Sequence, residues 1–388
     1  MAKLGEVFTI ASGGTPDKKK PFYYENGTIP WVKTGDLKTQ YVPEGIECIT
    51  EEGLDNSSAK LFPPNTVLVA MYGATIGACS ILPYEAATNQ ACAAFLPNEN
   101  VLPTYLYYFL SSKREQFVKD GVGGAQPNIS AGYLKNVQFG LIPMQQQIDI
   151  VEKLDKVEKL IALRKEQLAK LDQLVKSRFV EMFGDLAAPD CKWDSEKLVY
   201  ACVNPDDIKC GPFGTQLGKE EYVNEGVAVW EIPQINSLFS TAPTHYLTEE
   251  KAKQLEAYSI KPGDIAMSRK GNAGKCAVFP SNFESGVIHS DVLRIRVDSD
   301  RVLPLFMMYQ LHYSGAVQHQ IELVSSGAIM AGINVTKLKQ IFVHIPPLEL
   351  QNKFVSFVEQ VDKSKLTIQQ SLYKLELLKK SLMQQYFG

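Results

Sequence analysis

The chain has 388 residues, of which 45% are hydrophobic, and a formal net charge of -3. This length and hydrophobic content allow two cores of ordinary domain size. No stretch approaches the roughly 18 uninterrupted apolar residues of a membrane span, and the first ten residues lack a signal-peptide pattern, so we expect a cytoplasmic protein with no membrane contact.

Residues 1–144 are predicted to form a first mixed body of the α/β (α+β) class. Short β-prone runs such as TVLVAM (Thr66 to Met71) alternate with Gly, Pro and Asn, a pattern typical of strands joined by tight turns. One helix is predicted from Pro103 to Lys119, because Pro is favoured in the first turn of a helix.

Residues 145–184 are predicted to form a long helix, because neither Pro nor Gly interrupts the chain between Ile148 and Gly184. An apolar residue recurs every seven positions, which is the spacing of a coiled-coil seam. A second column is interrupted by Arg164 and Arg178, whose aliphatic stems we expect to cover the rim while their charges reach water. The predicted seam of this helix consists of Leu154, Ile161, Leu168 and Val175.

Residues 185–348 and 349–388 repeat this plan as a second body and a second long helix. The body contains the β-prone run VLRIRV (Val292 to Val297) and one predicted helix from Pro304 to Leu323, on one face of which His312 and His319 should lie. The interrupted column of the long helix carries Lys365 and Lys379. Its unbroken seam includes Val361, Ile368, Leu375 and Leu382. The two long helices are therefore predicted to pair, the alternative being that each packs on its own body.

The two halves are related in sequence. Residues 151–184 and 355–388 align without a gap at an offset of 204 residues. Ahead of them, shared anchors follow in the same order, for example Gly27 four residues before Trp31 and Gly226 four before Trp230. Ordered anchors of this kind predict an internal pseudo-twofold repeat of about 204 residues, in which both tryptophans belong to the core.

The search for catalytic chemistry finds little. GNAGKC at Gly271 is too short for a phosphate-binding loop and is predicted to be a turn between strands. The seven cysteines contain no C-x-x-C pair and the five histidines no metal spacing, so we expect no metal site. Only Asp190, Asp207 and Lys209 match a loose magnesium-nuclease pattern. The first half lacks this pattern, so a nuclease stays an alternative, as does a scaffold that does not bind DNA.

Several motifs together carry a family resemblance. They are LGEVFTIASGGTP at Leu4, IPWVKTGDL at Ile29, ATNQACAAF at Ala87, GGAQPNIS at Gly123 and IPMQQQ at Ile142, each with a counterpart in the second half. With the duplicated body-and-helix plan, the whole chain resembles the specificity subunit of type I restriction-modification systems. The second half departs from the pattern with CGPFGTQL at Cys210 and HSDV at His289.

The resemblance implies a function and its partners. The bodies would be two target recognition domains in tandem, each reading one half of a bipartite double-stranded DNA site. The helices would pair as an antiparallel coiled coil, set the spacing and dock two modification (methyltransferase) subunits. The chain would hold no catalytic residue and no cofactor: S-adenosylmethionine would bind to the methyltransferase, and ATP and magnesium to a restriction subunit where one is present. Because the net charge is -3, we expect clustered cations or partner subunits to supply the phosphate binding.

Residues that contact DNA are sought among polar side chains on loops near the shared motifs, since amides and cations read base edges. In the first body the candidates are Lys33, Thr34, Asp36, Tyr72, Thr75, Asn89, Gln90, Gln126 and Asn128. In the second body they are Gln234, Asn236, Arg269, Lys270, Asn272, His289, Ser290 and Asn334. The competing interpretation for Asn128 and Asn334 is a turn or a helix cap.

Overall fold

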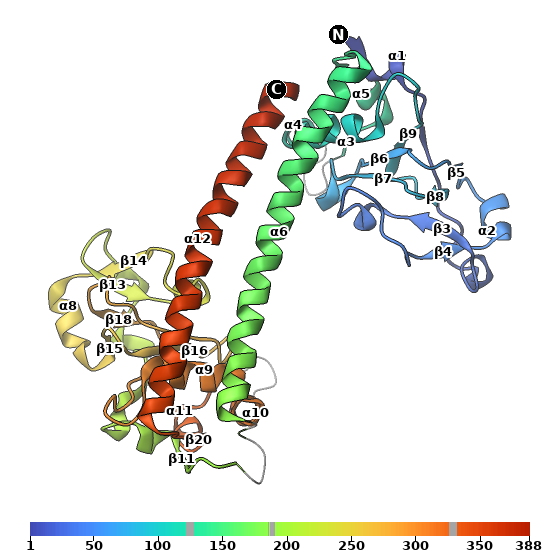
Figure 1. Ribbon diagram of the computed structural model, residues 1–388. Coiled ribbons are helices and arrows are strands. Elements are labelled where there is room, and N and C mark those ends of the chain that lie inside the picture. Colours follow the sequence, from blue (N-terminus) through green and yellow to red (C-terminus); the bar gives the residue numbers. More distant parts are fainter. Residues whose placement is uncertain (122–127, 185, 187–190, 326–331) are drawn as a thin grey trace. The chain divides into compact units, whose positions relative to one another are not determined.

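The computed structural model describes residues 1–121, 128–184, 186, 191–325 and 332–388. It divides into two compact units, one of Met1–Glu166 with Gln369–Gly388 and the other of Gln167–Ile368. Each unit therefore contains one mixed body and a segment of each of the two long helices, α6 (Met144–Phe183) and α12 (Leu348–Phe387) (Figure 1).

The first body is built on two four-stranded sheets and a short two-stranded one. One sheet has the order β2-β9-β6-β7 and is antiparallel, while the other has the order β4-β3-β8-β5 with β3 and β8 parallel. Strand β6 reads VLVA and is buried along its whole length, as a continuous apolar run predicts. The strands are β1 (Ala2–Lys3), β2 (Ile10–Ser12), β3 (Ile29–Val32), β4 (Cys48–Ile49), β5 (Leu61–Phe62), β6 (Val67–Ala70), β7 (Cys79–Ile81), β8 (Ala86–Thr88), β9 (Cys92–Phe95) and β10 (Gln138–Phe139).

The second body has the same topology. Its sheets have the orders β12-β19-β16-β17 and β14-β13-β18-β15, again with one parallel pair, β13 with β18. The strands are β11 (Ser195–Lys197), β12 (Ile208–Cys210), β13 (Val227–Trp230), β14 (His245–Leu247), β15 (Ser259–Ile260), β16 (Ile265–Ser268), β17 (Cys276–Val278), β18 (Gly286–Ile288), β19 (Val292–Ile295) and β20 (Phe342–His344). Trp31 and Trp230 are each 1% exposed, which confirms their predicted place in the cores.

In each body, two successive helices occupy the segment for which one continuous helix was predicted. The run from Pro103 is broken at Lys113, and the run from Pro304 is broken at Ser314, whose backbone is extended and whose hydroxyl caps the next helix. His312 and His319 consequently lie on different helices, so the prediction of one shared face is wrong. The helices of the bodies are α1 (Leu4–Val7), α2 (Glu51–Asp55), α3 (Pro103–Ser112), α4 (Arg114–Asp120), α5 (Ala131–Asn136), α7 (Ile232–Asn236), α8 (Glu249–Gln254), α9 (Pro304–Tyr313), α10 (Gly315–Val324) and α11 (Val335–Leu338).

A buried glutamine joins each long helix to its body. The amide of Gln147 accepts the backbone N–H of Leu102 at 2.9 Å and donates to the carbonyls of Asn100 and Ile142 at 2.8 and 2.9 Å. Gln351 makes the equivalent three bonds in the second unit, and both glutamines are 0% exposed. A buried amide with all these bonds formed fixes where the helix starts relative to the body.

The ends of both helices belong to the body cores. In the first unit, Leu154 of α6 and Phe387 of α12 join the core formed by the first body. In the second unit, Phe179 and Phe183 of α6 pack with Phe354 of α12 in the core of the second body. The Phe-Gly at the end of α6 thus has two roles. Phe183 packs in the core of the second body, and Gly184, whose φ of +75° favours glycine, ends the helix.

The two lysines that interrupt the second column of α12 have acidic partners on α6. In the second unit Lys365 Nζ lies 2.7 Å from Asp172 Oδ1, and in the first unit Lys379 pairs with Glu158. Each of these lysines therefore reaches a carboxylate of the neighbouring helix. Of the predicted seam, Leu154, Ile161, Val175 and Val361 are buried, and Leu168, Ile368, Leu375 and Leu382 are partly buried.

Candidate nucleic-acid interface

Three loops and the segment that begins at residue 128 bring the candidates of the first body together. The N–H of Asn89, just after β8, donates to the carbonyl of Val32 at the end of β3 at 3.0 Å. Beyond β6, Met71 donates to Ala91 at 2.8 Å and accepts from Ile129 at 3.0 Å. The segments after β3, β6 and β8 therefore form one continuous edge with the segment at residue 128, while Gln126 lies outside the described residues.

Side chains on this edge differ in their availability. Tyr72 is 44% exposed, and Gln90 and Asn128 are also exposed, with Gln90 hydrogen-bonded to the hydroxyl of Thr15. Asn89 and Thr75 are engaged locally: Asn89 accepts the N–H of Ala91 at 3.2 Å and the Thr75 hydroxyl donates to the carbonyl of Tyr72 at 3.3 Å. Tyr72, Gln90 and Asn128 are thus the side chains here that can reach a ligand without breaking the turns.

Lys33 occupies the start of the turn after β3. Asp36 accepts the N–H of Lys33 at 2.8 Å, which holds this turn, Thr34–Asp36, in place. The ammonium group of Lys33 lies 2.5 Å from Glu47, and this hydrogen bond raises the pKa of Lys33. Lys33 is therefore cationic but already paired, and a DNA phosphate would have to compete with Glu47 for it.

The second body builds the same edge from different residues. Ile333 donates to the carbonyl of Arg269 at 3.0 Å, and Arg269 donates to the carbonyl of Asp291 at 2.8 Å. His289, just after β18, donates to the carbonyl of Trp230 at the end of β13 at 2.9 Å. These bonds repeat the connections of the first body, so the structure brings Arg269, Lys270, His289, Ser290 and Asn334 to one edge.

Several second-body candidates are already paired within this edge. The Nε of Arg269 donates to the carbonyl of Ile333 at 3.1 Å, and its guanidinium group lies 4.8 Å from the centroid of the Phe213 ring. Lys270 forms an ion pair with Asp291 at 2.8 Å. Asn272 is exposed in the turn between β16 and β17, which confirms that GNAGKC is a turn.

Gln234 and Asn334 have clear structural roles. Gln234 is 2% exposed, accepts the N–H of Glu231 at 3.2 Å and donates to the carbonyl of Ala242 at 3.0 Å. This burial argues against a direct contact between Gln234 and DNA. Asn334 caps α11 by accepting the N–H of Lys337 at 3.0 Å, as the competing interpretation held.

Sequence reasoning missed the segments that cross behind each edge. A Cβ on Gly13 would lie 1.9 Å from the carbonyl oxygen of Thr88, and one on Gly211 would lie 2.3 Å from that of His289. Both positions therefore require glycine for close approach of two backbones. The divergent CGPFGTQL keeps this glycine and places Phe213, 49% exposed, under Arg269. The shared glycine in the two motifs was the available signal.

The nuclease alternative gains no support. Asp190 lies outside the described residues, Asp207 caps its own turn by accepting the N–H of Asn204 at 2.9 Å, and Lys209 lies 5.5 Å from the ring centroid of Tyr258. Among the residues that the structure describes, no group of three or more His, Cys, Asp or Glu side chains could hold a metal ion. Within the same residues, no helix is long and apolar enough to span a membrane.

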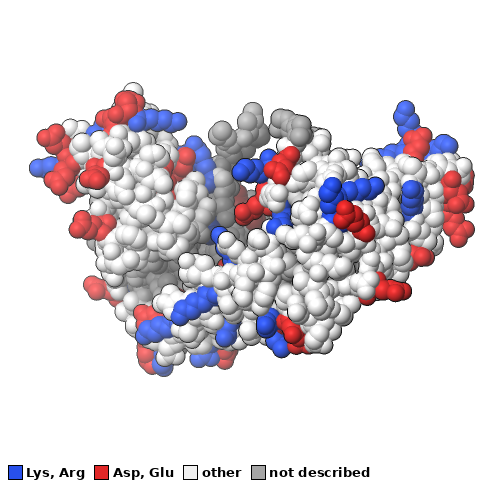
Figure 2. Space-filling view, turned by 90° about the horizontal axis from the view of Figure 1, so that it is seen from above, with Lys and Arg blue, Asp and Glu red and all other residues white. Residues whose placement is uncertain are grey.

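The charged side chains do not form one basic surface on the face shown in Figure 2. Lys and Arg alternate there with Asp and Glu. This mixed distribution agrees with the net charge of -3.

Comparison with known proteins identifies the family. The family model described as the type I restriction modification DNA specificity domain matches residues 1–173 and 209–377, one match in each half. The chain belongs to this family. It is a type I restriction-modification specificity subunit with two target recognition domains, and its function is DNA sequence specificity.

Relatives of this specificity subunit extend over its length. The MjaIX specificity subunit of Methanocaldococcus jannaschii is 23% identical over 412 aligned positions, covering 99% of this chain and 91% of the relative. The EcoR124I/EcoR124II specificity subunit of Escherichia coli is 30% identical over 188 residues, 47% of this chain and 46% of the relative.

Two solved structures share the fold. One, from a study of complex assembly and conformational transition of the type I system, has a TM-score of 0.63 at 19% identity, covering 100% of this chain and 96% of its own. The other, the S subunit from M. genitalium, has a TM-score of 0.56 at 15% identity, covering 100% and 95%.

Proposed function

We propose that this specificity subunit reads a bipartite site in double-stranded DNA, one half with each recognition domain, and performs no chemistry itself. Partner methyltransferase subunits bind S-adenosylmethionine and methylate the site. A restriction subunit, where the system has one, uses ATP and magnesium. The observation that carries this proposal is the repeated edge, on which two bodies of one topology present different side chains at equivalent positions.

Substitutions on each edge test this division of the site. Tyr72→Ala should relax discrimination in one half-site and Arg269→Ala in the other, each by about 1–3 kcal/mol, as expected for loss of a base contact. Tyr200→Ala removes a tyrosine that is 60% exposed but lies outside both edges, and it serves as the control. Binding of single-base variants of the site by the assembled complex measures the effect. Equal effects of Tyr72→Ala and Tyr200→Ala would contradict the proposal.

We further propose that α6 and α12 pair as an antiparallel coiled coil within a pseudo-twofold repeat of about 204 residues. Ion pairs between the helices support this in each unit, Lys165 with Glu376 at 3.5 Å in the first and Lys365 with Asp172 at 2.7 Å in the second. Both helices have 40 residues, start near an Ile-Pro pair and end on Phe-Gly, as a duplicated element should.

Two methyltransferase subunits dock on this helix pair at equivalent places. Leu174 of α6 and Leu378 of α12 are 204 positions apart and are 47% and 46% exposed, which leaves the same apolar side chain uncovered in each unit. Leu174→Asp or Leu378→Asp should each reduce the methyltransferase content from two copies to one, and the double variant should bind none, measured by mass photometry. Leu323→Asp, at a leucine 63% exposed on α10, is the control. Two copies retained in the double variant would refute this docking surface.

The helices also set the distance between the half-sites. One heptad inserted after Lys156 keeps the apolar register and lengthens the helix by about 10 Å, or about three base pairs. The unread gap should lengthen between unchanged half-sites, and binding should weaken because three base pairs also rotate the second half-site by about 100°. An active insertion variant that keeps the original gap would show that the helices do not measure DNA.

A further inference from the structure

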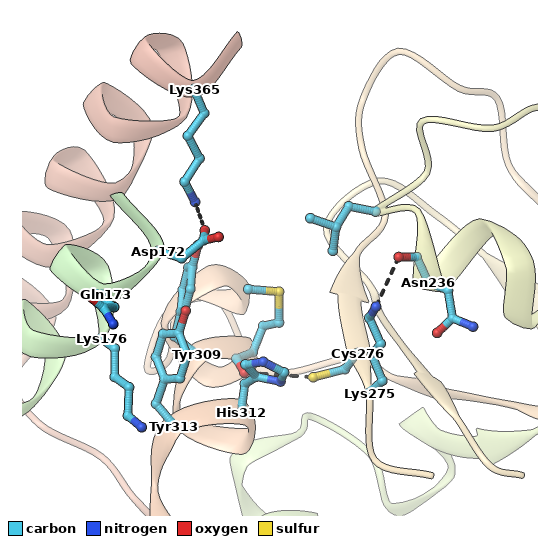
Figure 3. Close-up of a pocket in the computed structure, with 12 residues that line it drawn as sticks. Asp172, Gln173, Lys176, Asn236, Lys275, Cys276, Tyr309, His312, Tyr313 and Lys365 are labelled. Carbon is cyan, nitrogen blue, oxygen red and sulfur yellow. Dashed lines mark hydrogen bonds and ion pairs between the residues drawn. The ribbon is translucent and has the colours of Figure 1, made fainter. Parts of the chain in front are cut away.

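A pocket of about 480 Å³ opens in the second unit between the long helices, α9 and the loop after α7 (Figure 3). Three lysines reach it from three parts of the chain: Lys176 from α6, Lys275 from the residue just before β17, and Lys365 from α12. Only one carboxylate, that of Asp172, is among the side chains that line it. The pocket therefore gathers positive charge in a chain whose net charge is negative.

Two of these lysines keep their charge available. Lys365 is occupied by Asp172 at 2.7 Å and Asp362 at 3.5 Å. By contrast, Lys275 donates only to the neutral carbonyl of Asn236 at 3.0 Å, and Lys176 forms no ion pair with any residue that the structure describes. His312 lines the same pocket, and its pKa is lowered by burial and by the charges of Lys275 and Lys176. The side of the pocket near Lys176, Lys275 and His312 thus lacks a counter-charge.

The cations are not a by-product of the repeated fold. Strands β7 and β17 both begin at a cysteine, so Lys275 corresponds to Ala78, and helices α3 and α9 both begin at a proline, so His312 corresponds to Ser111. On the long helices, Lys365 corresponds to Ile161. Only Lys176 has a cationic counterpart, Lys380. Three of the four basic side chains of the pocket therefore stand where the first unit has a small or apolar residue.

The wall opposite the helices is held in a fixed shape. Leu238 is 65% exposed at the pocket although its φ is +52°, a left-handed conformation that bulky residues rarely adopt. Its neighbour Phe239 has a φ of +59° and anchors the loop with a ring that is 3% exposed and packs on Trp230 and Phe279. An exposed apolar side chain beside two ammonium groups that lack a carboxylate partner among the described residues suits a sugar-phosphate unit, which has an apolar and an anionic part.

We propose that this pocket is a phosphate-binding site of the second recognition domain and that it takes one phosphate of the DNA backbone beside that domain's half-site. The inference rests on the proposed DNA-binding function and adds to it a phosphate contact that the second recognition domain makes and the first does not. Lys176 and Lys275 neutralise the phosphate, and Leu238 contacts the adjoining sugar. Such a contact strengthens binding equally for all sequences and adds no discrimination between bases.

The salt dependence of DNA binding tests this assignment. The complex with its methyltransferase would be titrated against a duplex that carries its site, by fluorescence anisotropy over a range of KCl concentrations. Lys176→Gln and Lys275→Gln should each lower the slope of log K against log [salt], and the double variant should lower it by about 1 in all, because the pocket takes one phosphate and its loss releases about one counterion fewer. Glutamine keeps a donor for the carbonyl of Asn236, so the loop should be preserved. Lys380→Gln, the counterpart in the first unit, should leave the slope unchanged.

Other outcomes identify other occupants and overturn the proposal. Slopes equal to wild type, with less methyltransferase bound, would place an acidic side chain of the partner in the pocket. A free nucleotide or phosphate would be indicated if the variants keep the wild-type slope and calorimetry shows that the wild-type complex binds ATP or inorganic phosphate while Lys176→Gln does not. Failure of the wild-type complex to prefer its site over a scrambled duplex would instead contradict the proposed function, so the two failures are distinguishable.

Discussion

The end of the chain should be essential for the stability of the first recognition domain. Phe387 is 5% exposed, and its ring centroid lies 5.3 Å from that of Tyr105 and 6.1 Å from that of Phe109. Lys113 adds a hydrogen bond of 2.6 Å to the carbonyl of Phe387. Phe387→Ala should therefore destabilise the first unit by about 3 kcal/mol, the lower end for a buried Phe→Ala change.

Differential scanning calorimetry measures this effect. For a unit of this size, 1 kcal/mol corresponds to about 2–4 °C, so the transition of the first unit should fall by about 6–12 °C. Tyr373→Ala is the control on the same helix, since Tyr373 is 63% exposed, and should cost less than about 0.5 kcal/mol. If both variants melt at the same temperature, the C-terminal helix end is not part of the first core and the reasoning fails.

Three further predictions concern a buried amide, a strained loop and the independence of the bodies. Gln147→Leu should lower the free energy of unfolding, measured by urea denaturation, by about 3 kcal/mol because it leaves three backbone groups unpaired. The control Gln145→Leu, at an exposed position, should leave the free energy of unfolding almost unchanged. Equal losses in both variants would contradict the role of the buried amide. Leu238→Gly should raise the melting temperature, because glycine adopts the φ of +52° at this position without strain. The control Val203→Gly, at a side chain that is 67% exposed and has no positive φ, should lower the melting temperature. A lower melting temperature in both variants would argue against strain at Leu238. Exchange of residues 1–141 for those of a relative should alter one half of the methylated site, and altered readout of both halves would refute independent domains.

The sequence predicted the large elements of this fold well because their signals are long. A run without Pro or Gly and a seven-residue apolar spacing predicted the first long helix at residues 145–184, and the structure has it at Met144–Phe183. Shorter signals failed, as at Ser314, where one serine hydroxyl that caps α10 divides the predicted helix in two. A single hydrogen bond of this kind is not visible in hydrophobic periodicity.

The candidate sites were predicted less completely, because a polar residue near a turn shared by the two halves can either bind a ligand or hold the turn. Gln234 and Asn334 satisfy backbone groups, whereas Tyr72 and Gln90 face outward, and only tertiary contacts separate the two cases. Lys176 and Lys275 were not among the candidates. They are 99 positions apart in the sequence and only the packing of α6 against the second body brings them to one pocket.

The measurement that tests DNA specificity most directly is single-molecule methylation mapping of DNA from cells that express this chain with its methyltransferase. Two recognition domains predict one bipartite motif, with two short specific blocks separated by a gap of roughly 5 to 8 unread base pairs, as half-sites about one helical turn apart require. Wild-type DNA should carry this mark, and DNA from cells that express the methyltransferase alone should lack it. Methylation of a continuous motif, or the same methylation without the chain, would contradict two domains that each read half of a split site.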